Sequence, residues 1–398
     1  MAKPQQALLI VQRKAAKVNA RVQDVSGPSG SGAAKSTANR TMAPQRILII
    51  SDAWAPQVNG VVRSYENLRR ELHKAGHVVR VISPMEFGTV PLPGYGEIRL
   101  ALFPYRRLSA MITAFAPTAV HIAVEGPLGW AARRYCLRRG IPFSTAFHTN
   151  FPAYVALRAP RVLRGMLERM TLAFVRRFHA PAHHTFVSTA SIEAQMRGWG
   201  FTGCLVRLSR GVDPEQFFPV PDRPASVPPV LLYVGRVAPE KNLDGFLGLT
   251  EAQTGPARKV VVGEGPALAK LRLAYPDVTF HGMLTGTALA NAYRCADVFV
   301  FPSRTDTFGI VLIEALASGL PVAAHNVPGP RDLVTDPGLG ALDDDLGAAI
   351  RRALQAPGSR SYRHAHARKM YSWESMAATF LRHCPARAPS SRTALSGR

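Results

Sequence analysis

Short β-branched segments alternate with longer amphipathic segments along most of this chain, and this pattern limits the possible folds more than any other feature. It is typical of parallel sheets whose two faces are covered by crossover helices. One series of predicted strands comprises Arg46–Ser51, Val78–Ile82, Ala119–Val124, Phe143–Phe147, Thr185–Val187 and Leu205–Leu208. A second series comprises Val230–Val234, Lys259–Val262, Val278–His281, Val298–Phe301 and Val322–Ala324. The fold class is therefore α/β, with two doubly wound, Rossmann-like domains.

The length of 398 residues also favours two domains. We expect an N-terminal domain at 44–218, a proline-rich linker at 219–229, a C-terminal domain at 230–360, and a C-terminal helix at 361–384 whose crossing back to the first domain is left open. The Gly/Ser/Ala-rich extension at 1–43 and the tail at 385–398 are predicted to be disordered. Because Met42 stands just before the first strand, it is a hypothetical start of translation.

The chain is strongly basic, with 49 Lys and Arg against 26 Asp and Glu and a net charge of +23. Such a surface attracts phosphates, anionic lipids and nucleic acids. Specific nucleic-acid binding is the weaker choice, because no zinc-type spacing or RNA-binding aromatic signature is present. The four cysteines are far apart in sequence, which fits unpaired thiols in a reducing compartment. Since no apolar run approaches about 20 residues, we expect a cytoplasmic protein, with the inner face of the cytoplasmic membrane as a peripheral location that stays open.

Two loops at predicted strand ends carry candidate ligand-binding residues, because open α/β sheets bind ligands beyond the carboxyl ends of their strands. Arg236 and Lys241 follow the strand Val230–Val234, and their charges would neutralise a diphosphate. The alternative is a pair of solvated surface cations. Gly263-Glu264-Gly265 follows the next strand, and its glycines would permit close backbone approach to a ligand, although an ordinary tight turn has the same pattern.

A third strand-end loop leads from Pro302 into a predicted helix. Phe308, Gly309 and Ile310 would open that helix and direct free backbone N–H groups at a phosphate. Asp306 and Glu314 would accept hydrogen bonds from sugar and ribose hydroxyls. Alternatively, Asp306 is a helix cap and Glu314 is solvated.

Together, these loops resemble the donor domain of the retaining glycosyltransferases of family 4, which have the GT-B fold. The hallmark of that family is Glu, seven residues, Glu, and this chain has Asp306, seven residues and Glu314. The segment from Arg236 to Lys241, continued by Asn242, matches the basic loop of the family. The resemblance implies that the two cations hold the diphosphate, that the first acid contacts the donor sugar and that the second contacts the ribose. It also implies that the two domains face each other across a cleft.

The first predicted domain carries further segments that resemble the family. Pro56–Arg63, with Gly60, is similar to the glycine loop that borders the acceptor and the donor phosphate. Phe147–Pro152 is similar to the segment whose histidine, here His148, approaches the donor sugar. His121–Pro127 and Arg207–Asp213 also match family segments. The branch that the chain resembles contains bacterial α-mannosyltransferases and sulfoquinovosyl transferases.

The resemblance implies retaining transfer of a hexose, of the mannose or glucose type, from a GDP- or UDP-sugar to a lipid or glycan acceptor, with formation of an α-glycosidic bond. We expect no cofactor and no essential metal. The sugar, the base and the acceptor stay open. The alternatives are a GT-B enzyme of another class, such as an epimerase, and a non-catalytic nucleotide- or polyanion-binding protein. The candidate catalytic residues are His148, Arg236, Lys241, Asp306 and Glu314, and the candidate donor-binding residues are Gly60, Arg236, Lys241, Gly263, Glu264, Gly265, Phe308, Gly309, Ile310 and Glu314.

One predicted helix, Arg161–Phe178, is amphipathic and basic. Such a helix either packs its apolar face on its own domain or binds an anionic membrane surface. The predicted apolar face comprises Leu163, Met166, Leu167, Met170, Phe174 and Phe178, and the basic face comprises Arg161, Arg164, Arg169 and Arg176.

Overall fold

The computed structural model describes residues 43–57, 59–92, 95–148, 150, 162–220 and 223–386. Apart from Ala43, the predicted N-terminal extension and its hypothetical start Met42 lie outside the described residues, as does the predicted tail beyond Ala386. Parts of two predicted motifs, Val58 and residues 149 and 151–152, lie outside as well.

The first sheet contains six parallel strands in the order β2-β1-β5-β6-β7-β8. Ile47–Ile50 of β1 are fully buried, as expected for a strand that is covered on both faces. The order of the chain reverses between β1 and β5, and this switch point is where such sheets bind ligands. The strands are β1 (Arg46–Ile50), β2 (Val78–Ile82), β5 (Ala119–Ile122), β6 (Ser144–Ala146), β7 (His184–Val187) and β8 (Leu205–Arg207).

The second sheet also contains six parallel strands, in the order β11-β10-β9-β12-β13-β14. This is the Rossmann order, and its switch point lies between β9 and β12. The two sheets confirm the predicted pair of doubly wound, Rossmann-like units. The strands are β9 (Val230–Val234), β10 (Arg258–Val262), β11 (Thr279–Gly282), β12 (Val298–Phe301), β13 (Val322–Ala324) and β14 (Gly340–Leu342).

Three of the observed strands were not predicted. β3 (Thr89–Leu92) and β4 (Tyr95–Ala101) form an antiparallel pair, in which Pro91 weakens the strand signal. β14 is short and contains Gly340 and no β-branched residue, so its sequence has little strand character. Its pairing with β13 is a property of the sheet and not of the segment alone.

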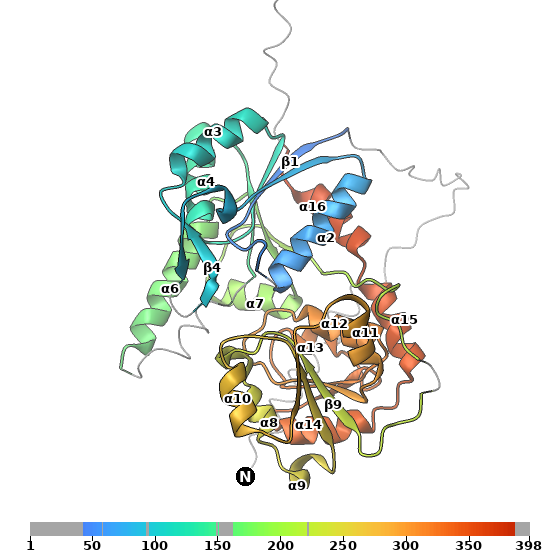
Figure 1. The fold of residues 1–398 in the computed structure, drawn as a ribbon. Coiled ribbons are helices and arrows are strands. Elements are labelled where there is room, and N and C mark those ends of the chain that lie inside the picture. The colour runs from blue at the N-terminus through green and yellow to red at the C-terminus, as the bar shows by residue number, and fades with distance from the viewer. Residues whose placement is uncertain are drawn as a thin grey trace, which may run out of the picture. The chain divides into compact units, whose positions relative to one another are not determined.

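Helix α2 (Gly60–Lys74), labelled in Figure 1, is an example of how a helix of the first half is capped and buried. The side chain of Asn59 accepts hydrogen bonds from the backbone N–H groups of Val61 and Val62, both at 3.0 Å, and so caps the helix. Tyr65, Leu68 and Leu72 recur at helical spacing and are fully buried. The other elements of this half are η1 (Pro84–Glu86), α3 (Tyr105–Phe115), α4 (Pro127–Arg139), α6 (Arg164–His179) and α7 (Ala190–Gly198).

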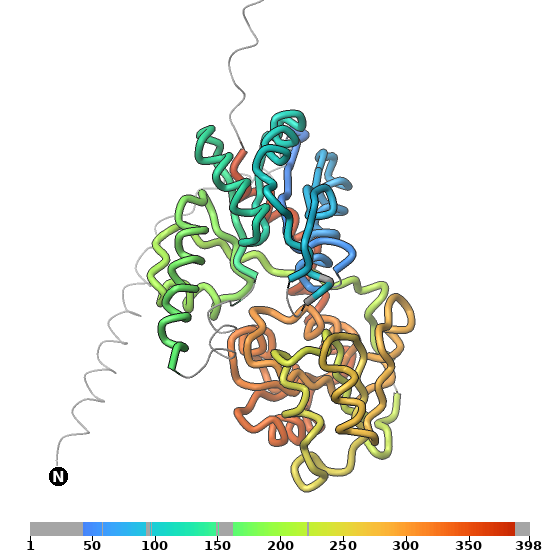
Figure 2. The backbone as a smooth tube through the Cα atoms, turned by 60° about the vertical axis from the view of Figure 1, so that its left-hand side comes forward, coloured from blue at the N-terminus to red at the C-terminus, as the bar shows by residue number. Residues whose placement is uncertain are grey.

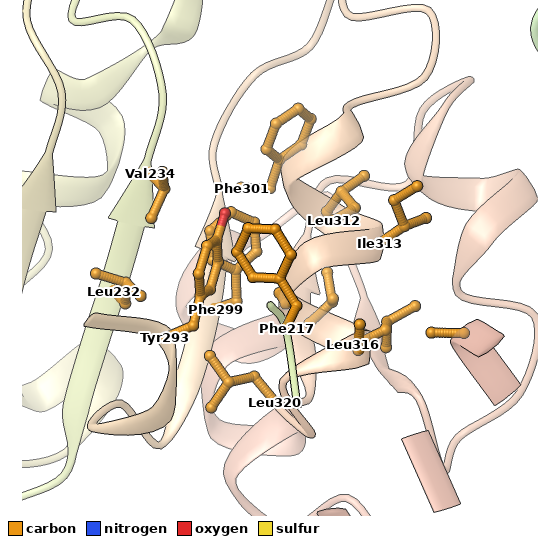
Figure 3. Packing of buried hydrophobic residues seen from close by; sticks show 14 of the residues in the cluster. Phe217, Leu232, Val234, Tyr293, Phe299, Phe301, Leu312, Ile313, Leu316 and Leu320 are labelled. Carbon is orange, nitrogen blue, oxygen red and sulfur yellow. The ribbon is translucent and has the colours of Figure 1, made fainter. Parts of the chain in front are cut away.

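Helix α12 (Ile310–Ala317) is the most apolar helix around the second sheet, and Leu312–Ala317 are all buried. Its residues Leu312 and Leu316 face Phe217, Tyr293 and Phe299 in the core shown in Figure 3. A helix that is apolar on most sides belongs in a core, and this one carries Glu314 into it. The neighbouring elements are η2 (Pro239–Lys241), α8 (Leu243–Leu247), α9 (Glu251–Thr254), α10 (Leu268–Ala274), α11 (Gly286–Arg294), α13 (Pro330–Leu333) and α14 (Leu346–Leu354).

The C-terminal segment forms two helices where one was expected. α15 (Arg360–Met370) packs against α12, and α16 (Trp373–His383) packs against α2. The break lies at Ser372, whose side chain caps α16 by accepting from Ser375 N at 3.2 Å. Trp373, Met376 and Phe380 join the core on the first sheet. In Figures 1 and 2 the red α16 accordingly lies with the blue part of the chain.

The predicted amphipathic helix is present as α6, with Arg161 outside the described residues. Only Val175, Phe178 and His179 are buried along it. The predicted apolar face is largely exposed, because Met166, Met170 and Phe174 are 47%, 61% and 42% exposed. Packing on its own domain therefore accounts only for the last turns of the helix. Within the described part of the chain, no helix combines the length and apolar character of a membrane span.

Candidate active site

The neighbouring strands β9 and β12 bring Lys241 and Asp306 together at their carboxyl ends. Lys241 Nζ donates to both carboxylate oxygens of Asp306, at 2.6 and 2.9 Å. The two side chains are 22% and 23% exposed, so a ligand can reach the pair. The alternative that Asp306 caps the helix is wrong, because Gly309 is the N-cap of α12 and no side chain caps it.

The two glycine-containing loops of the second sheet pack against each other. A Cβ atom on Gly263 would lie 1.9 Å from Gly235 O, and one on Gly265 would lie 2.3 Å from Val237 O. Both glycines also have positive φ angles, 137° and 154°. The tight packing of the loops therefore requires these glycines, whether or not a ligand also approaches them.

The side chains on these loops are accessible to different degrees. Arg236 is half-buried, and its carbonyl oxygen accepts from the Tyr233 hydroxyl at 2.8 Å. Glu264 is exposed, and its carbonyl oxygen accepts from Val237 N at 2.8 Å. A donor contact by Arg236 or Glu264 remains a prediction.

The N-terminus of α12 lies beside the N-terminus of α2. Gly309, with a φ of 83°, turns the chain into α12 at Ile310. A Cβ atom on Gly60, the first residue of α2, would lie 3.8 Å from Ile310 Cγ2. Phe308 is buried, with its ring 6.2 Å from that of Tyr371. The uncapped first turn of α12 has the geometry of an anion seat, because its N–H groups lack intrahelical partners.

Glu314 is buried, so the alternative of a solvated carboxylate is wrong. It is 1% exposed. Its Oε1 lies 2.7 Å from Arg63 NH1 of α2, and its Oε2 accepts from the Tyr293 hydroxyl at 3.0 Å. Burial raises the pKa of the Glu314 carboxyl, while the Arg63 charge opposes that shift. Both oxygens thus have partners, and one partner comes from the other Rossmann-like half.

A cavity of about 630 Å³ opens beside the Arg63–Glu314 ion pair. Basic side chains of α2 line it, and Gly211–Asp213 and Trp373 close its other side. Arg236, Lys241 and Asp306 do not line this cavity. The lining of this cavity therefore includes the predicted ribose ligand Glu314 and does not include the predicted diphosphate-binding cations.

His148 follows β6 and is held through three of its atoms. Its Nδ1 lies 2.9 Å from Arg210 NH2, and its Nε2 lies 2.8 Å from the Tyr65 hydroxyl. Its carbonyl oxygen accepts from the Thr307 hydroxyl at 2.7 Å. Burial, followed by the Arg210 charge, holds the pKa of His148 well below its usual value, so the ring is neutral at neutral pH.

The loop that contains Asp306 and Gly309 is thereby tied to the strand ends of the first sheet. Thr307 donates to His148, and the carbonyl oxygen of Thr307 accepts from Ser188 Oγ at 2.7 Å. Sequence reasoning missed Tyr65, Ser188 and Thr307 because their partners lie 83 to 159 residues away in the chain. Sequence reasoning included Arg63 and Arg210 only as members of the segments Pro56–Arg63 and Arg207–Asp213, and it gave neither residue a role of its own.

The switch point of the first sheet holds buried carboxylates. Asp52, after β1, accepts from Leu128 N and Gly129 N at 3.0 Å each, at the start of α4. Desolvation raises the pKa of the Asp52 carboxyl to about 6. Glu125, after β5, pairs with His179 at 3.0 Å, and both side chains are almost fully buried. This end of the first sheet therefore holds buried polar groups with short contacts, although Glu125 Oε2 has no hydrogen-bond partner among the described residues.

Chemically, the second half offers accessible cations and a helix N-terminus that can bind an anion, while the first half offers the neutral hydrogen-bonding groups His148 and Tyr65. Cations and helix N-termini stabilise a departing diphosphate. Neutral donors and acceptors orient hydroxyl groups without adding charge. This combination suits transfer of a hydroxyl-rich group away from a phosphate.

Comparisons with known proteins agree with these features. Residues 58–216 match the family described as Glycosyltransferase Family 4, and residues 228–356 match the family described as Glycosyl transferases group 1. A GDP-mannose-dependent alpha-mannosyltransferase of Mycobacterium tuberculosis is 33% identical over 76% of this chain and 84% of its own length. A sulfoquinovosyl transferase of Arabidopsis thaliana is 29% identical over 74% of this chain and 62% of its own length. The solved structure of a sucrose-phosphate synthase from Thermosynechococcus elongatus shares the fold, with a TM-score of 0.68, 23% identity, and coverage of 85% of this chain and 98% of that one.

Proposed function

The chain belongs to glycosyltransferase family 4, and from this premise we propose that it transfers mannose from GDP-mannose to a lipid acceptor at a membrane surface. It is a retaining glycosyltransferase of the GT-B fold that uses a nucleotide sugar and forms an α-linked hexoside on a lipid or glycan. The base, the sugar and the lipid surface are the proposal. GDP-mannose is supported by the name and the 33% identity of the mycobacterial relative.

The observation that carries the proposal is the Lys241–Asp306 pair at the switch point of the second sheet. The pair is accessible, and Asp306 lies three residues before Gly309, the N-cap of α12, which no side chain caps. In the proposed complex, Lys241 and Arg236 contact the diphosphate, which also lies at the Gly309 turn. Asp306, released from Lys241, accepts hydrogen bonds from the transferred sugar, and Glu314 accepts them from the ribose.

The reaction is proposed to need no metal, because the two cations and the helix N-terminus supply positive charge to the leaving diphosphate. Transfer assays with and without EDTA test this point. A strict requirement for an added divalent ion would contradict it.

The lipid acceptor is supported by the exposed surface of α6. Met166, Met170 and Phe174 leave apolar area open to solvent, and Arg164 and Arg169 are exposed on the same helix. α4 extends this basic surface, and its Arg133 donates to the carbonyl oxygens of Arg177 and Phe178 of α6. Apolar area flanked by cations is complementary to an anionic lipid surface.

A donor screen tests the chemistry of the proposal. Because a bound ligand stabilises the native state, GDP and GDP-mannose should raise the melting temperature more than UDP and UDP-glucose. GDP-mannose should then release mannose or transfer it to a lipid extract. Stabilisation by UDP-sugars alone would replace the proposed donor. Binding without any sugar release would favour the non-catalytic alternative, and a changed but unreleased sugar would favour the epimerase.

Vesicle flotation tests the lipid surface separately. The protein should bind anionic vesicles at low salt, bind neutral vesicles weakly, and dissociate as salt screens the charges. If it ignores anionic vesicles at low salt, a soluble glycan becomes the better acceptor.

A further inference from the structure

Arg210 is a buried arginine that follows β8 and lies between the two Rossmann-like halves. It is 6% exposed, and among the described residues no carboxylate pairs with it. Its NH1 donates to Leu208 O at 2.7 Å, its NH2 lies 2.9 Å from His148 Nδ1, and its guanidinium lies 5.9 Å from the Phe308 ring centroid. Burying a cation without a counter-ion is costly. The groups that Arg210 contacts should therefore explain its position.

The contact with His148 determines where the imidazole proton lies. A guanidinium group has N–H donors and no acceptor. Arg210 NH2 therefore donates to His148 Nδ1, so the neutral ring carries its proton on Nε2. That N–H is directed at the Tyr65 hydroxyl oxygen, 2.8 Å away. Tyr65 must then donate its own proton to His121 Nε2, 2.7 Å away.

The chain of bonds continues into the core of the first half. His121 carries its proton on Nδ1 and donates it to Ser144 Oγ at 2.9 Å, and Ser144 Oγ lies 3.6 Å from Cys384 Sγ. Burial lowers the pKa of His121 to about 3. His148, Tyr65 and His121 are thus neutral at neutral pH, and the cation Arg210, which can only donate, sets the direction of the hydrogen bonds.

Resting on the proposed function and on the predicted approach of His148 to the donor sugar, we propose that Arg210 is a positioning residue that holds His148 as a hydrogen-bond donor at Nε2. Nδ1 accepts from Arg210 and the Nε2–H is donated to Tyr65, so neither ring nitrogen is available as a base for the acceptor hydroxyl. The His148 carbonyl also accepts from Thr307, next to Asp306. Arg210 thereby links the orientation of the imidazole to that of the loop at the donor site.

The pH dependence of the reaction follows from the surroundings of His148. The titratable and charged groups around its ring are Arg210, Tyr65 of α2, His121 of β5 and His179 of α6. The positive charge of Arg210 lowers the pKa of His148 in addition to burial. Loss of that charge moves the pKa upward, so the ring becomes protonated at a higher pH.

Substitutions at Arg210 separate positioning from packing. Arg210→Lys keeps a cation that can only donate, whereas Arg210→Gln removes the charge and offers an amide that donates or accepts. We expect the Lys variant to retain the Nε2–H form of His148 and the wild-type pH profile of kcat/KM. The Gln variant should show a mixture of tautomers, and the acidic limb of its pH profile should move to higher pH.

Nitrogen-15 NMR of histidine-labelled protein reads the tautomer directly, with the His148 signals identified by their loss in His148→Asn. Circular dichroism and thermal unfolding establish that each variant is folded. A folded Gln variant with the wild-type tautomer and pH profile would overturn the proposal, since packing alone changes stability but not these two readouts.

Tyr65→Phe keeps the inference testable if the Gln variant does not fold. It removes the hydroxyl that faces Nε2 but leaves Arg210 in place, so His148 should keep its proton on Nε2. Movement of the proton to Nδ1 would show that Tyr65 sets the tautomer, and the proposal would be wrong. The NMR readout needs no turnover. An inactive protein with the expected tautomer therefore counts against the proposed function and not against this inference.

Discussion

At the strand ends of the second sheet, Lys241 and Asp306 form an ion pair that is about one-fifth exposed, whereas at the strand ends of the first sheet His121, Glu125 and His179 are almost fully buried. The two halves share a doubly wound sheet, so the fold itself does not cause this difference. Exposed opposite charges can exchange their partners for a charged ligand at small cost. Buried polar groups that contact one another cannot exchange partners without leaving a polar atom unsatisfied.

The comparison suggests a division of labour in the site. The second half binds and releases a charged donor, while the first half holds a fixed hydrogen-bonding surface against which the sugar is oriented. The Arg63–Glu314 pair and the Thr307 hydroxyl join the two halves. Groups that can exchange partners can bind ligands that differ in other parts of their structure. Groups held in place by the protein fix the orientation of the reacting sugar.

The largest expected effect is on turnover when the accessible cation is removed. Lys241→Ala should lower kcat by about 10²–10³-fold, because it removes a donor to the charge that develops on the leaving diphosphate. Steady-state kinetics with GDP-mannose measure this loss. Lys270→Ala, on the exposed face of α10, is the matched control and should leave kcat unchanged. Equal losses in both variants would mean that the exposed pair has no special part in transfer.

The buried carboxyl of Asp52 in the first half should make the stability of the protein depend on pH. The folded-state pKa of Asp52, about 6, lies above its ordinary value of 3.8. Folded protein therefore binds this proton more tightly, and its contribution to stability is lost as pH rises from about 4 through 6. The difference in unfolding free energy between wild type and Asp52→Asn should fall by on the order of 3 kcal/mol over that range. Urea unfolding at several pH values measures it, and a pH-independent difference would mean that Asp52 titrates normally.

A smaller effect is expected at the carboxylate that combines features of both halves. Glu314 is buried yet predicted to accept hydrogen bonds from the ribose, and such charged bonds contribute about 1.5–3 kcal/mol. Glu314→Gln should therefore weaken GDP binding by roughly 10- to 100-fold, as measured by calorimetry. Glu251→Gln, exposed on α9, is the control. Tighter binding in Glu314→Gln would show instead that the carboxylate acts only as the partner of Arg63.

The smallest expected effect concerns the surface of the first half. Each cation near an anionic leaflet contributes about 1 kcal/mol, so Arg169→Gln on α6 should weaken binding to anionic vesicles by roughly fivefold. Arg258→Gln removes an exposed charge from the second half and should have little effect. Equal weakening by both substitutions would indicate that net charge, and not the surface of α6, drives binding.

The sequence by itself determined every strand of the two six-stranded sheets except β14, together with the positions of the strand-end loops of the second half. β2, β9, β12 and β13 have the predicted bounds, and in β9, β12 and β13 this is because buried parallel strands consist of continuous apolar residues. Lys241 and Asp306 were predicted as binding residues because each follows such a strand. Since β9 and β12 are neighbours in the sheet, the two side chains come into contact. These features depend on local sequence and a topological rule.

Only the tertiary structure decided which buried polar groups of the first half are hydrogen-bonded to each other and which residues form contacts between the two halves. Arg63 pairs with Glu314, and Arg210 donates to His148, although the residues of each pair are so far apart in the sequence that no local pattern predicts the contact. The same holds for Gly263, which the sequence marked as a ligand loop and whose missing Cβ makes room for Gly235 O. Local propensity and periodicity report which residues are buried and in which element. The partner of a buried polar group is set by which distant elements the whole chain brings within about 3 Å, because hydrogen bonds act only at that range.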